Sequence, residues 1–446
     1  MSRPSMHIGL LVHPYGNHPA SWLFADAPSG AEVSIEHYVN VTKMAESGAM
    51  DFVFFADVPA IREGNIMAVR RWPLYAAQFE PITLLGALAA ATSRIGLAAT
   101  ASTSYSEPYN IARQFASLDH LSHGRVGWNV VTTSQPAAAY NFGRNARDEH
   151  AIRYERAREF LSVVMGLWDS WEDDAFGRNK VAAEFFDPAK LHQLNFTGKY
   201  VSVRGPLNVP RPPQGHPVIF QAGGSEPGKA LAAETAEVVF TQDRNLKTAQ
   251  AFYADVKGRL PKFGRSTSDL KILSGLNPIV GRTQAEAEDR FAALQAKLHP
   301  DVGREILSID LDGVDLSDVP LDSPIPTSKL PATVEGGKSY LNYMKQLIAD
   351  GNTTVRKLYS HYAVARGGNF IVGSPTKVAD LMEEWFTTNA ADGFMIGLSY
   401  LPSGLNEFVE LVIPELRRRK LFRGAYDGKT LRDHLGLRRP ANRYVA

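Results

Sequence analysis

Residues 124–143 read GRVGWNVVTTSQPAAAYNFG, and this stretch decides the fold. The apolar run over 125–132 predicts a buried strand, and its end carries hydrogen-bonding side chains: Asn129, Thr132 and Thr133. A buried parallel strand that delivers polar groups to the loop after it is typical of a site in a βα barrel. We therefore expect the chemistry at the C-terminal end of this strand.

Short apolar runs recur along the chain, and most are followed by an amphipathic, helix-like stretch. The predicted strands span 6–13, 51–57, 94–102, 125–132, 218–222, 238–242, 271–281 and 393–400. The predicted helices span 34–48, 81–92, 108–121, 148–169, 225–235, 246–263, 283–298 and 406–419. Eight strand–helix units predict an α/β fold of the (β/α)8 TIM-barrel type. An open doubly wound sheet would normally carry GxGxxG after its first strand, and the sequence has none there.

Two segments interrupt this rhythm. Residues 170–216 are rich in acidic residues, Pro and Gly, and FTGKYVSVRGPLNVP within them predicts a hairpin. Residues 299–372 carry DLDGVDLSDVPLDSPIP and then two or three expected helical turns. Such long insertions in a compact domain are usually lids or binding loops. We interpret residues 1–446 as a single barrel domain with two insertions, the second acting as a lid. The predicted hinges of this lid are Gly336, Gly337, Gly351, Gly367 and Gly368.

Composition excludes several classes of function. A formal net charge of +1 gives no electrostatic basis for binding nucleic acid or an anionic membrane. The absence of cysteine excludes disulfides, thiolate metal sites and cysteine nucleophiles. The apolar run before His13 is too short for a signal peptide or a membrane span, so we expect a cytoplasmic protein.

Polar side chains follow two further strands. Asp57 ends the run DFVFFAD, where its carboxylate can accept hydrogen bonds from a ring N–H or a ribityl hydroxyl; a helix cap or loop carboxylate is the other interpretation. Thr103 follows GLAATAS within a cluster of hydroxyl groups. Such a cluster suits a polyol or a phosphate, although turns favour the same residues.

Helical geometry places His150 and Tyr154 on one face. At about 100° per residue they share a stripe with Ala157 and Leu161, which we expect to face the barrel. Both residues lie at the N-terminal end of the helix, beside the C-terminus of the preceding strand. The pair should therefore point into the barrel mouth, the alternative being a packed histidine beside a tyrosine whose hydroxyl reaches solvent.

The segment QAGGSEPG at 221–228 predicts a close approach of backbone to ligand. Gly223 and Gly224 lack side chains, and Ser225 is placed to cap a helix whose first amides can bind a phosphate. A plain strand–turn–helix connection needs similar residues, so this segment alone is a weak signal. His120 and His123 lie at a helix end, where cations suit the dipole, and His13 and His18 have no nearby carboxylate at ligand spacing, so we predict no metal site.

Taken together, these segments resemble the bacterial-luciferase-like superfamily, and within it the branch of nitrilotriacetate and dibenzothiophene sulfone monooxygenases. The most specific motifs are FFAD, EPYNIARQFASLDHLSHGRVGWNVVTT, YNFG with HAIRY after it, and QAGGSEPG. The resemblance runs from MHIGLLVHP to GAYDGKTLRDHLGL, nearly the whole chain.

The resemblance implies a luciferase-like barrel that binds reduced FMN from a separate NAD(P)H:flavin reductase and oxidises a small organic substrate with O2 through a C4a-(hydro)peroxyflavin. Its flavin contacts map to Asp57, Thr103, His150, Tyr154 and Ser225, with Gly224 in the same loop and Asn129 near the flavin ring. His150 is the one candidate for steering a proton, and no other catalytic residue is assigned. A homodimer or homotetramer is expected.

Three alternatives remain open from sequence. A deazaflavin (F420)-dependent hydride-transfer enzyme of the same superfamily is the nearest. A flavin-free barrel hydrolase would use strand-end carboxylates such as Asp57. A non-catalytic flavin-binding subunit would bind flavin without consuming oxygen in response to a substrate.

Overall fold

The computed structural model describes residues 5–61, 63–133, 135–311, 313–332, 338–351, 354–365 and 368–445. Eight parallel strands close into a barrel, because β8 pairs with β9 as well as with β7. In spatial order they are β9 (Lys271–Val280), β11 (Gly393–Gly397), β1 (His7–Leu11), β2 (Phe52–Phe55), β3 (Gly96–Ser102), β4 (Val126–Val131), β7 (Val218–Ala222) and β8 (Val238–Thr241). The predicted TIM barrel and its eight strands are confirmed.

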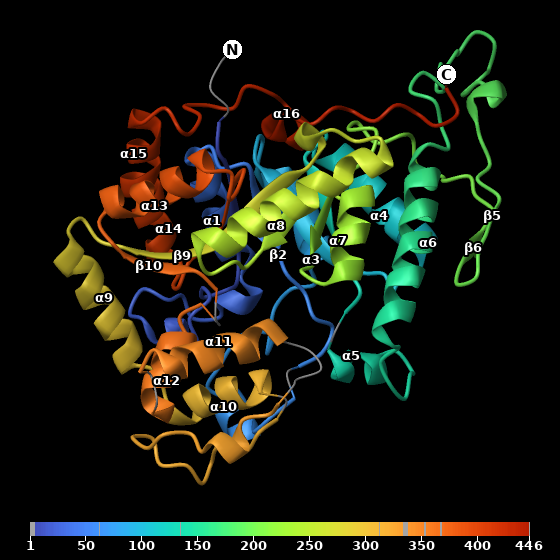
Figure 1. Cartoon of the computed structure of the whole chain (residues 1–446). Coiled ribbons are helices and arrows are strands. Elements are labelled where there is room, and N and C mark those ends of the chain that lie inside the picture. The colour runs from blue at the N-terminus through green and yellow to red at the C-terminus, as the bar shows by residue number, and fades with distance from the viewer. Residues whose placement is uncertain are drawn as a thin grey trace.

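Helices surround the barrel (Figure 1). Those predicted from sequence are α1 (Ile35–Ser47), α3 (Pro81–Ala91), α4 (Pro108–Leu121), α6 (His150–Trp168), α7 (Glu226–Thr235), α8 (Leu246–Arg259) and α9 (Gln284–Ala296). The last predicted helix is divided into α14 (Ser403–Glu407), a π-helical segment (Phe408–Val412) and α15 (Ile413–Arg418). Helix α13 (Pro375–Thr387) was missed, although Ser374 caps it and Pro375 occupies its first turn, both of which are start signals.

The interior of the barrel is filled by apolar side chains. The rings of Phe52 and Phe220 meet edge to face with centroids 4.8 Å apart. Residue 127 is glycine because a Cβ there would lie 2.3 Å from the Phe220 ring. At the N-terminal end of the strands, leucines of α16 (Leu431–Leu435) join the same apolar cluster and close the barrel floor. Ligands are thus confined to the C-terminal end of the strands, which is the barrel mouth.

The insertion at 299–372 is more helical than its sequence predicted. It contains α10 (Pro300–Asp310), α11 (Lys338–Ala349), α12 (Val355–Tyr362) and β10 (Phe370–Gly373), the last paired with the end of β9. These helices lie below the barrel, on the side where the strands end (Figure 1). They share a hydrophobic cluster of their own with Trp72, which explains their stability better than local propensity does. Three of the predicted hinges, Gly336, Gly337 and Gly367, lie outside the described residues.

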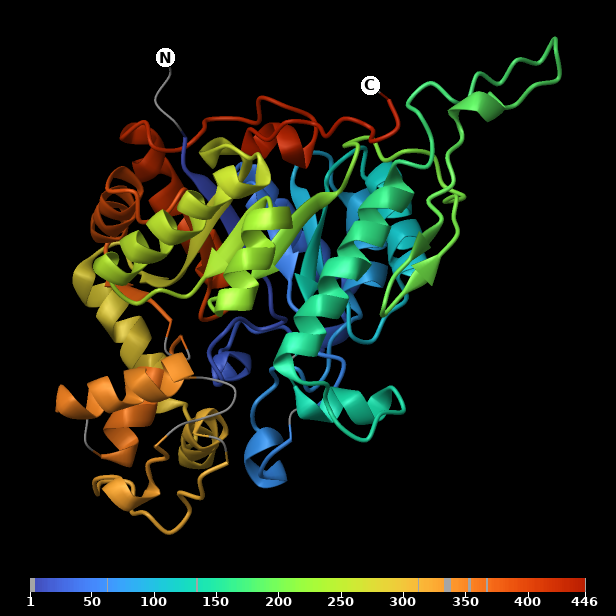
Figure 2. The same cartoon turned by 45° about the vertical axis from the view of Figure 1, so that its right-hand side comes forward.

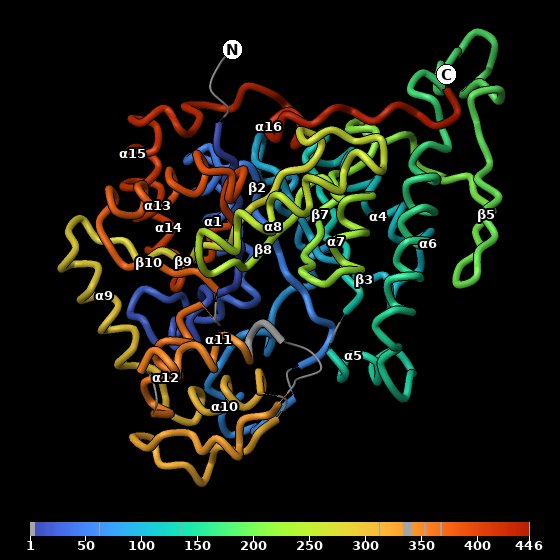
Figure 3. The backbone as a smooth tube through the Cα atoms, viewed as in Figure 1, coloured from blue at the N-terminus to red at the C-terminus, as the bar shows by residue number. Residues whose placement is uncertain are grey.

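The insertion at 170–216 contains the predicted hairpin, formed by β5 (Phe196–Thr197) and β6 (Ser202–Val203). The C-terminal tail crosses the barrel floor and ends at the base of this insertion (Figure 3). There the Asn442 amide donates to the carbonyl oxygens of Asp169 and Trp171.

The remaining short elements are α2 (Ile66–Val69), α5 (Pro136–Asn141) and 3-10 turns at Ser21–Leu23, Ala31–Val33, Pro188–Lys190, Leu260–Phe263, Thr267–Asp269 and Thr327–Lys329. Within the described residues, no helix has the length and apolar character needed to cross a membrane.

Candidate functional site at the barrel mouth

Asn129 contributes an unsatisfied acceptor to the interior of the barrel, toward the C-terminal end of β4. Its position in β4 alternates with Trp128 and Val130, which pack outward, so its side chain shares the inner face of the strand. The Asn129 Nδ2 donates to Thr100 Oγ1 at 2.8 Å, whereas its Oδ1 is buried without a hydrogen-bond partner among the described residues. An unsatisfied buried acceptor is costly, so this atom is suited to a ligand N–H.

Asp57 and Thr103 lie directly after β2 and β3, as predicted. The Asp57 carboxylate accepts a hydrogen bond from Gln78 Nε2 at 3.1 Å, and burial raises its pKa. The Thr103 hydroxyl is buried and donates to the carbonyl oxygen of Val131 at 3.2 Å, so it can still act as an acceptor. Sequence analysis missed Gln78, because only the fold brings it beside Asp57.

Tyr154 and Ser225 meet at the N-terminus of α7. A Cβ placed on Gly228 would lie 3.1 Å from both the Tyr154 hydroxyl and Ser225 Oγ, and one on Gly223 would lie 3.6 Å from the Tyr154 hydroxyl. The two glycines therefore let the backbone pack closely against the two hydroxyl groups, and we call this arrangement at the start of α7 the α7 cradle. Ser225 also caps the helix by accepting from Gly228 N at 3.2 Å. Gly224 borders open space, since no atom lies within 4 Å of where its Cβ would be.

His150 is the first residue of α6 and is exposed. Its ring lies beside that of Tyr154, with centroids 4.8 Å apart. The pKa of His150 is lowered, first by partial burial and then by the positive charges of Arg153 and Arg147. The helical phase thus placed the Tyr154 hydroxyl at the α7 cradle, while His150 stands at the open edge and is neutral at pH 7.

Two arginines of α6 fix the strand ends, and sequence analysis missed both. Arg153 is buried and donates from Nη1 to the carbonyl oxygens of Thr132 and Thr133 at 3.1 and 3.3 Å. Arg156 donates from Nε to the carbonyl oxygen of Thr103 at 3.0 Å. Their positive charge at the ends of β3 and β4 favours an anionic group such as a phosphate at the barrel mouth. The sequence could have indicated these two arginines by their position near Tyr154 on α6.

A second set of polar groups follows β1. The Asn17 Nδ2 donates to Asn277 Oδ1 at 3.0 Å. His18 is buried, which lowers its pKa to about 3, and its Nδ1 accepts from the backbone N–H of Ala20 at 3.1 Å. The neutral ring therefore carries its proton on Nε2, which is buried without a partner among the described residues. Among all the residues that the structure describes, no group of three or more His, Asp or Glu residues is placed to hold a metal ion.

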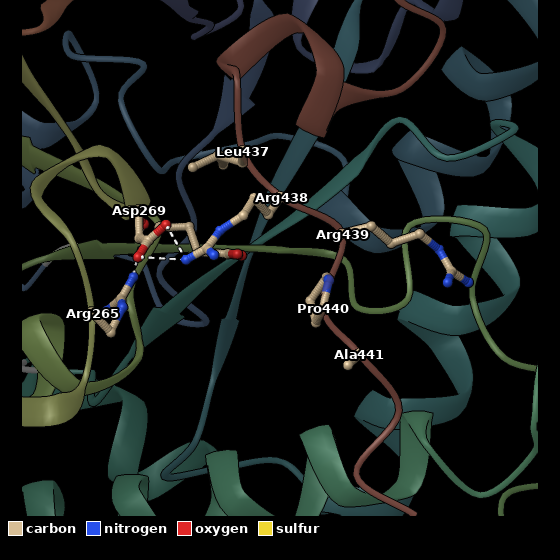
Figure 4. A pocket seen from close by; sticks show the side chains of 8 residues that line it. Arg265, Asp269, Leu437, Arg438, Arg439, Pro440 and Ala441 are labelled. Carbon is tan, nitrogen blue, oxygen red and sulfur yellow. Dashed lines mark hydrogen bonds and ion pairs between the residues drawn. The ribbon is translucent and has the colours of Figure 1, made fainter. Parts of the chain in front are cut away.

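A pocket of about 420 Å³ lies at the barrel floor, opposite the mouth (Figure 4). Its lining residues are Glu237, Arg265, Asp269, Leu437, Arg438, Arg439, Pro440 and Ala441. The charges here already have partners: Arg438 bonds both oxygens of Asp269 at 3.1 Å, and Arg439 pairs with Asp173. The pocket therefore fastens the C-terminal tail and is separate from the strand ends.

The fold and the site define the class: a (β/α)8-barrel enzyme whose polar groups gather at the C-terminal ends of the strands. The model of the luciferase-like monooxygenase family matches residues 20–392, and the chain belongs to this family.

Relatives and solved structures agree with this assignment. The chain is 48% identical to N-acetyl-S-(2-succino)cysteine monooxygenase of Bacillus subtilis (strain 168), covering 99% of both chains. It is 47% identical to nitrilotriacetate monooxygenase component A of Aminobacter aminovorans, covering 98% of this chain and 97% of the relative. A riboflavin lyase, solved with modified FMN and riboflavin, superimposes with a TM-score of 0.84 at 29% identity, over 97% of this chain and 96% of that chain. The protein is a flavin-dependent monooxygenase of the luciferase-like family.

Proposed function

We propose that the chain is the oxygenase component of a two-component system. It takes reduced FMN from a separate NAD(P)H:flavin reductase and uses O2 to oxidise a small organic substrate. The word "component" in the name of the nitrilotriacetate relative supports a separate partner. We further propose that it acts in the cytoplasm as a homodimer or homotetramer, with residues 1–446 forming a single barrel domain.

The α7 cradle is the observation that carries the proposal. The hydroxyl groups of Tyr154 and Ser225 lie together at the first turn of α7, beside the open space at Gly224, and the amides of this turn would suit the phosphate of FMN. The unpartnered Asn129 Oδ1 is suited to a ring N–H of the isoalloxazine, and the Asp57 carboxylate, just after β2, would accept from a ribityl hydroxyl or a ring N–H. Gly224 and Thr103 complete the proposed contacts, with His150 at the open edge beside Tyr154.

Reduced FMN, when bound, supplies the two electrons that let one atom of O2 enter the substrate while the other becomes water. The residues of this chain would bind the reduced flavin, orient it and shield it from water. Tyr154 and Ser225 would hold the phosphate end of FMN, and Asn129 would bind its ring. Neutral His150 is placed to accept or donate a proton at the edge of the site. Helices α10 to α12 would act as the lid that limits access of water.

Anaerobic titration with reduced FMN, reduced FAD and reduced F420 tests the cofactor. We expect the tightest binding for reduced FMN; tighter binding of FAD would contradict the FMN assignment, and tighter binding of F420 would favour hydride transfer. Coupled assays with NADH, FMN and a generic flavin reductase test the reaction. Nitrilotriacetate and N-acetyl-S-(2-succino)cysteine, the substrates named for two relatives, are the first to try.

Substrate-dependent oxygen uptake with product one oxygen atom heavier is the expected result. Activity without flavin or reductant would instead identify a hydrolase. Flavin binding without substrate-dependent oxygen uptake across a broad panel would identify an accessory subunit.

A further inference from the structure

An arm formed by residues 171–192 projects from the barrel at the end opposite the mouth (Figure 2). Backbone hydrogen bonds hold its two sides together: Arg178 N donates to Phe185 O at 3.1 Å, and Asp187 N donates to Ala175 O at 2.8 Å. Isolated bridges join Trp171 to Leu191 and Asn179 to Glu184. The arm is therefore an ordered, two-sided structure that extends into solvent.

The root of the arm is fixed to the rest of the chain. Trp171 Nε1 donates to the carbonyl oxygen of Leu207 at 2.8 Å, and the Asn442 amide donates to the carbonyl oxygen of Trp171 at 2.9 Å. The ring of Tyr444, in the C-terminal tail, stacks on His192 with centroids 4.5 Å apart. These contacts fix the orientation of the arm relative to the barrel. A surface loop that binds nothing would not need such a fixed orientation.

The far part of the arm exposes apolar side chains. All residues from 177 to 189 are exposed, and Val181, Phe185 and Phe186 are 100%, 62% and 38% exposed. On the inner side, Phe186 packs against Trp171, and Phe185 packs against Phe176. Apolar side chains presented on an ordered projection are typical of a protein–protein contact.

The charges around these apolar side chains are complementary to one another. Arg178 and Lys180 lie on the outgoing side of the arm, and Glu184 and Asp187 lie on the returning side. No ion pair is found for these four residues within the described part of the chain. In a contact with twofold symmetry, each residue of one copy faces the reciprocal residue of the other. Two arms packed in this way would bring Arg178 and Lys180 of each against Glu184 and Asp187 of the other.

We propose that the arm is a self-association surface, on which a second copy of this chain packs its own arm about a twofold axis. Val181, Phe185 and Phe186 form the apolar centre, and the four charged residues flank it. A net charge of +1 gives two copies little long-range repulsion. The reductase is a less suitable occupant, because the arm lies at the end opposite the mouth where reduced flavin must enter. The inference names a surface and does not depend on the flavin chemistry.

Sedimentation analysis of the full chain over a range of concentrations tests the proposal. We expect Phe185→Glu to raise the dissociation constant for self-association at least tenfold, or to give an assembly of fewer subunits than the wild type. Leu121→Glu is the matched control, since Leu121 is 61% exposed and lies outside the arm, at the end of α4; it should assemble as the wild type does.

Charge reversal provides a second, independent measurement. Arg178→Glu alone should weaken association, because it places like charges opposite each other, and the double change Arg178→Glu with Glu184→Arg should restore it. A wild-type chain that stays monomeric at tens of micromolar would overturn the proposal. So would an unchanged subunit number and dissociation constant in Phe185→Glu, or a double variant that associates no better than Arg178→Glu.

Discussion

Replacement of Tyr154 by phenylalanine is the sharpest test of the α7 cradle. The change removes the hydroxyl and keeps the half-buried ring that packs against the core. A hydrogen bond to a charged group contributes about 1.5–3 kcal/mol, and each 1.4 kcal/mol is about a factor of ten, so we expect the Kd for reduced FMN to rise roughly 10- to 150-fold. No described residue pairs with this hydroxyl, so the free energy of unfolding should change by less than about 0.5 kcal/mol.

Anaerobic fluorescence titration gives the Kd, and thermal unfolding of the flavin-free protein gives the stability. Tyr444→Phe is the control, because it removes a hydroxyl from the C-terminal tail at the opposite end of the barrel. Wild-type affinity in Tyr154→Phe would refute the reasoning. A fall in melting temperature with normal flavin affinity would show that Tyr154 only packs.

Three further predictions follow from the site. Asn129→Leu should weaken binding of reduced FMN at least tenfold, since it removes the unpartnered Oδ1, and should also lower stability by about 0.5–1.5 kcal/mol, since Nδ2 no longer donates to Thr100 Oγ1; calorimetric titration giving equal affinities would count against this contact. His18 has a folded-state pKa of about 3, below its unfolded value, so its contribution to stability is full above about pH 6.5 and declines by about 1.4 kcal/mol per pH unit as pH falls toward 3. In urea unfolding between pH 4.5 and 7.5, the free energy of unfolding of His18→Gln should therefore depend less steeply on pH than that of the wild type. An unchanged slope would contradict a buried neutral imidazole. Glu305→Ala should loosen α10 from the loop before α2, because Glu305 Oε1 accepts from Asn65 N at 3.0 Å. If these helices act as a lid, the amount of hydrogen peroxide released per reduced flavin consumed should rise. An unchanged ratio of peroxide to flavin would argue against a lid.

The barrel was predictable because its signals are local. Each barrel strand is a short apolar run buried on both faces, and β4 was predicted within one residue at each end. Strand β10 and the cluster that joins α10 to α12 with Trp72 depend on contacts between segments far apart in sequence, so local patterns did not reveal them. The domain assignment of residues 299–372 and their role as a lid remain predictions.

Side chains at the ends of strands and helices could be predicted as candidate site residues, whereas side chains that hydrogen-bond the backbone could not. Helical phase was sufficient to aim Tyr154, and its contact with the α7 cradle followed from the order of strand, turn and helix. Arg153 and Arg156 bond carbonyl oxygens, which every residue has, so no residue type in the sequence marks their partners. The unpartnered oxygen of Asn129 likewise depends on which neighbours the barrel brings near.

Closure of the barrel also determines when the chain can complete its folding during protein synthesis. Strand β1 pairs with β11, and the floor is sealed by α16, so both wait for residues made near the end of translation. Until then the nascent chain presents an open parallel sheet with two unpaired edges, which is prone to aggregate. Truncations that remove α16 or the tail should therefore lower the soluble yield in cells much more than their small number of residues implies, and chaperones that hold nascent chains should offset that loss.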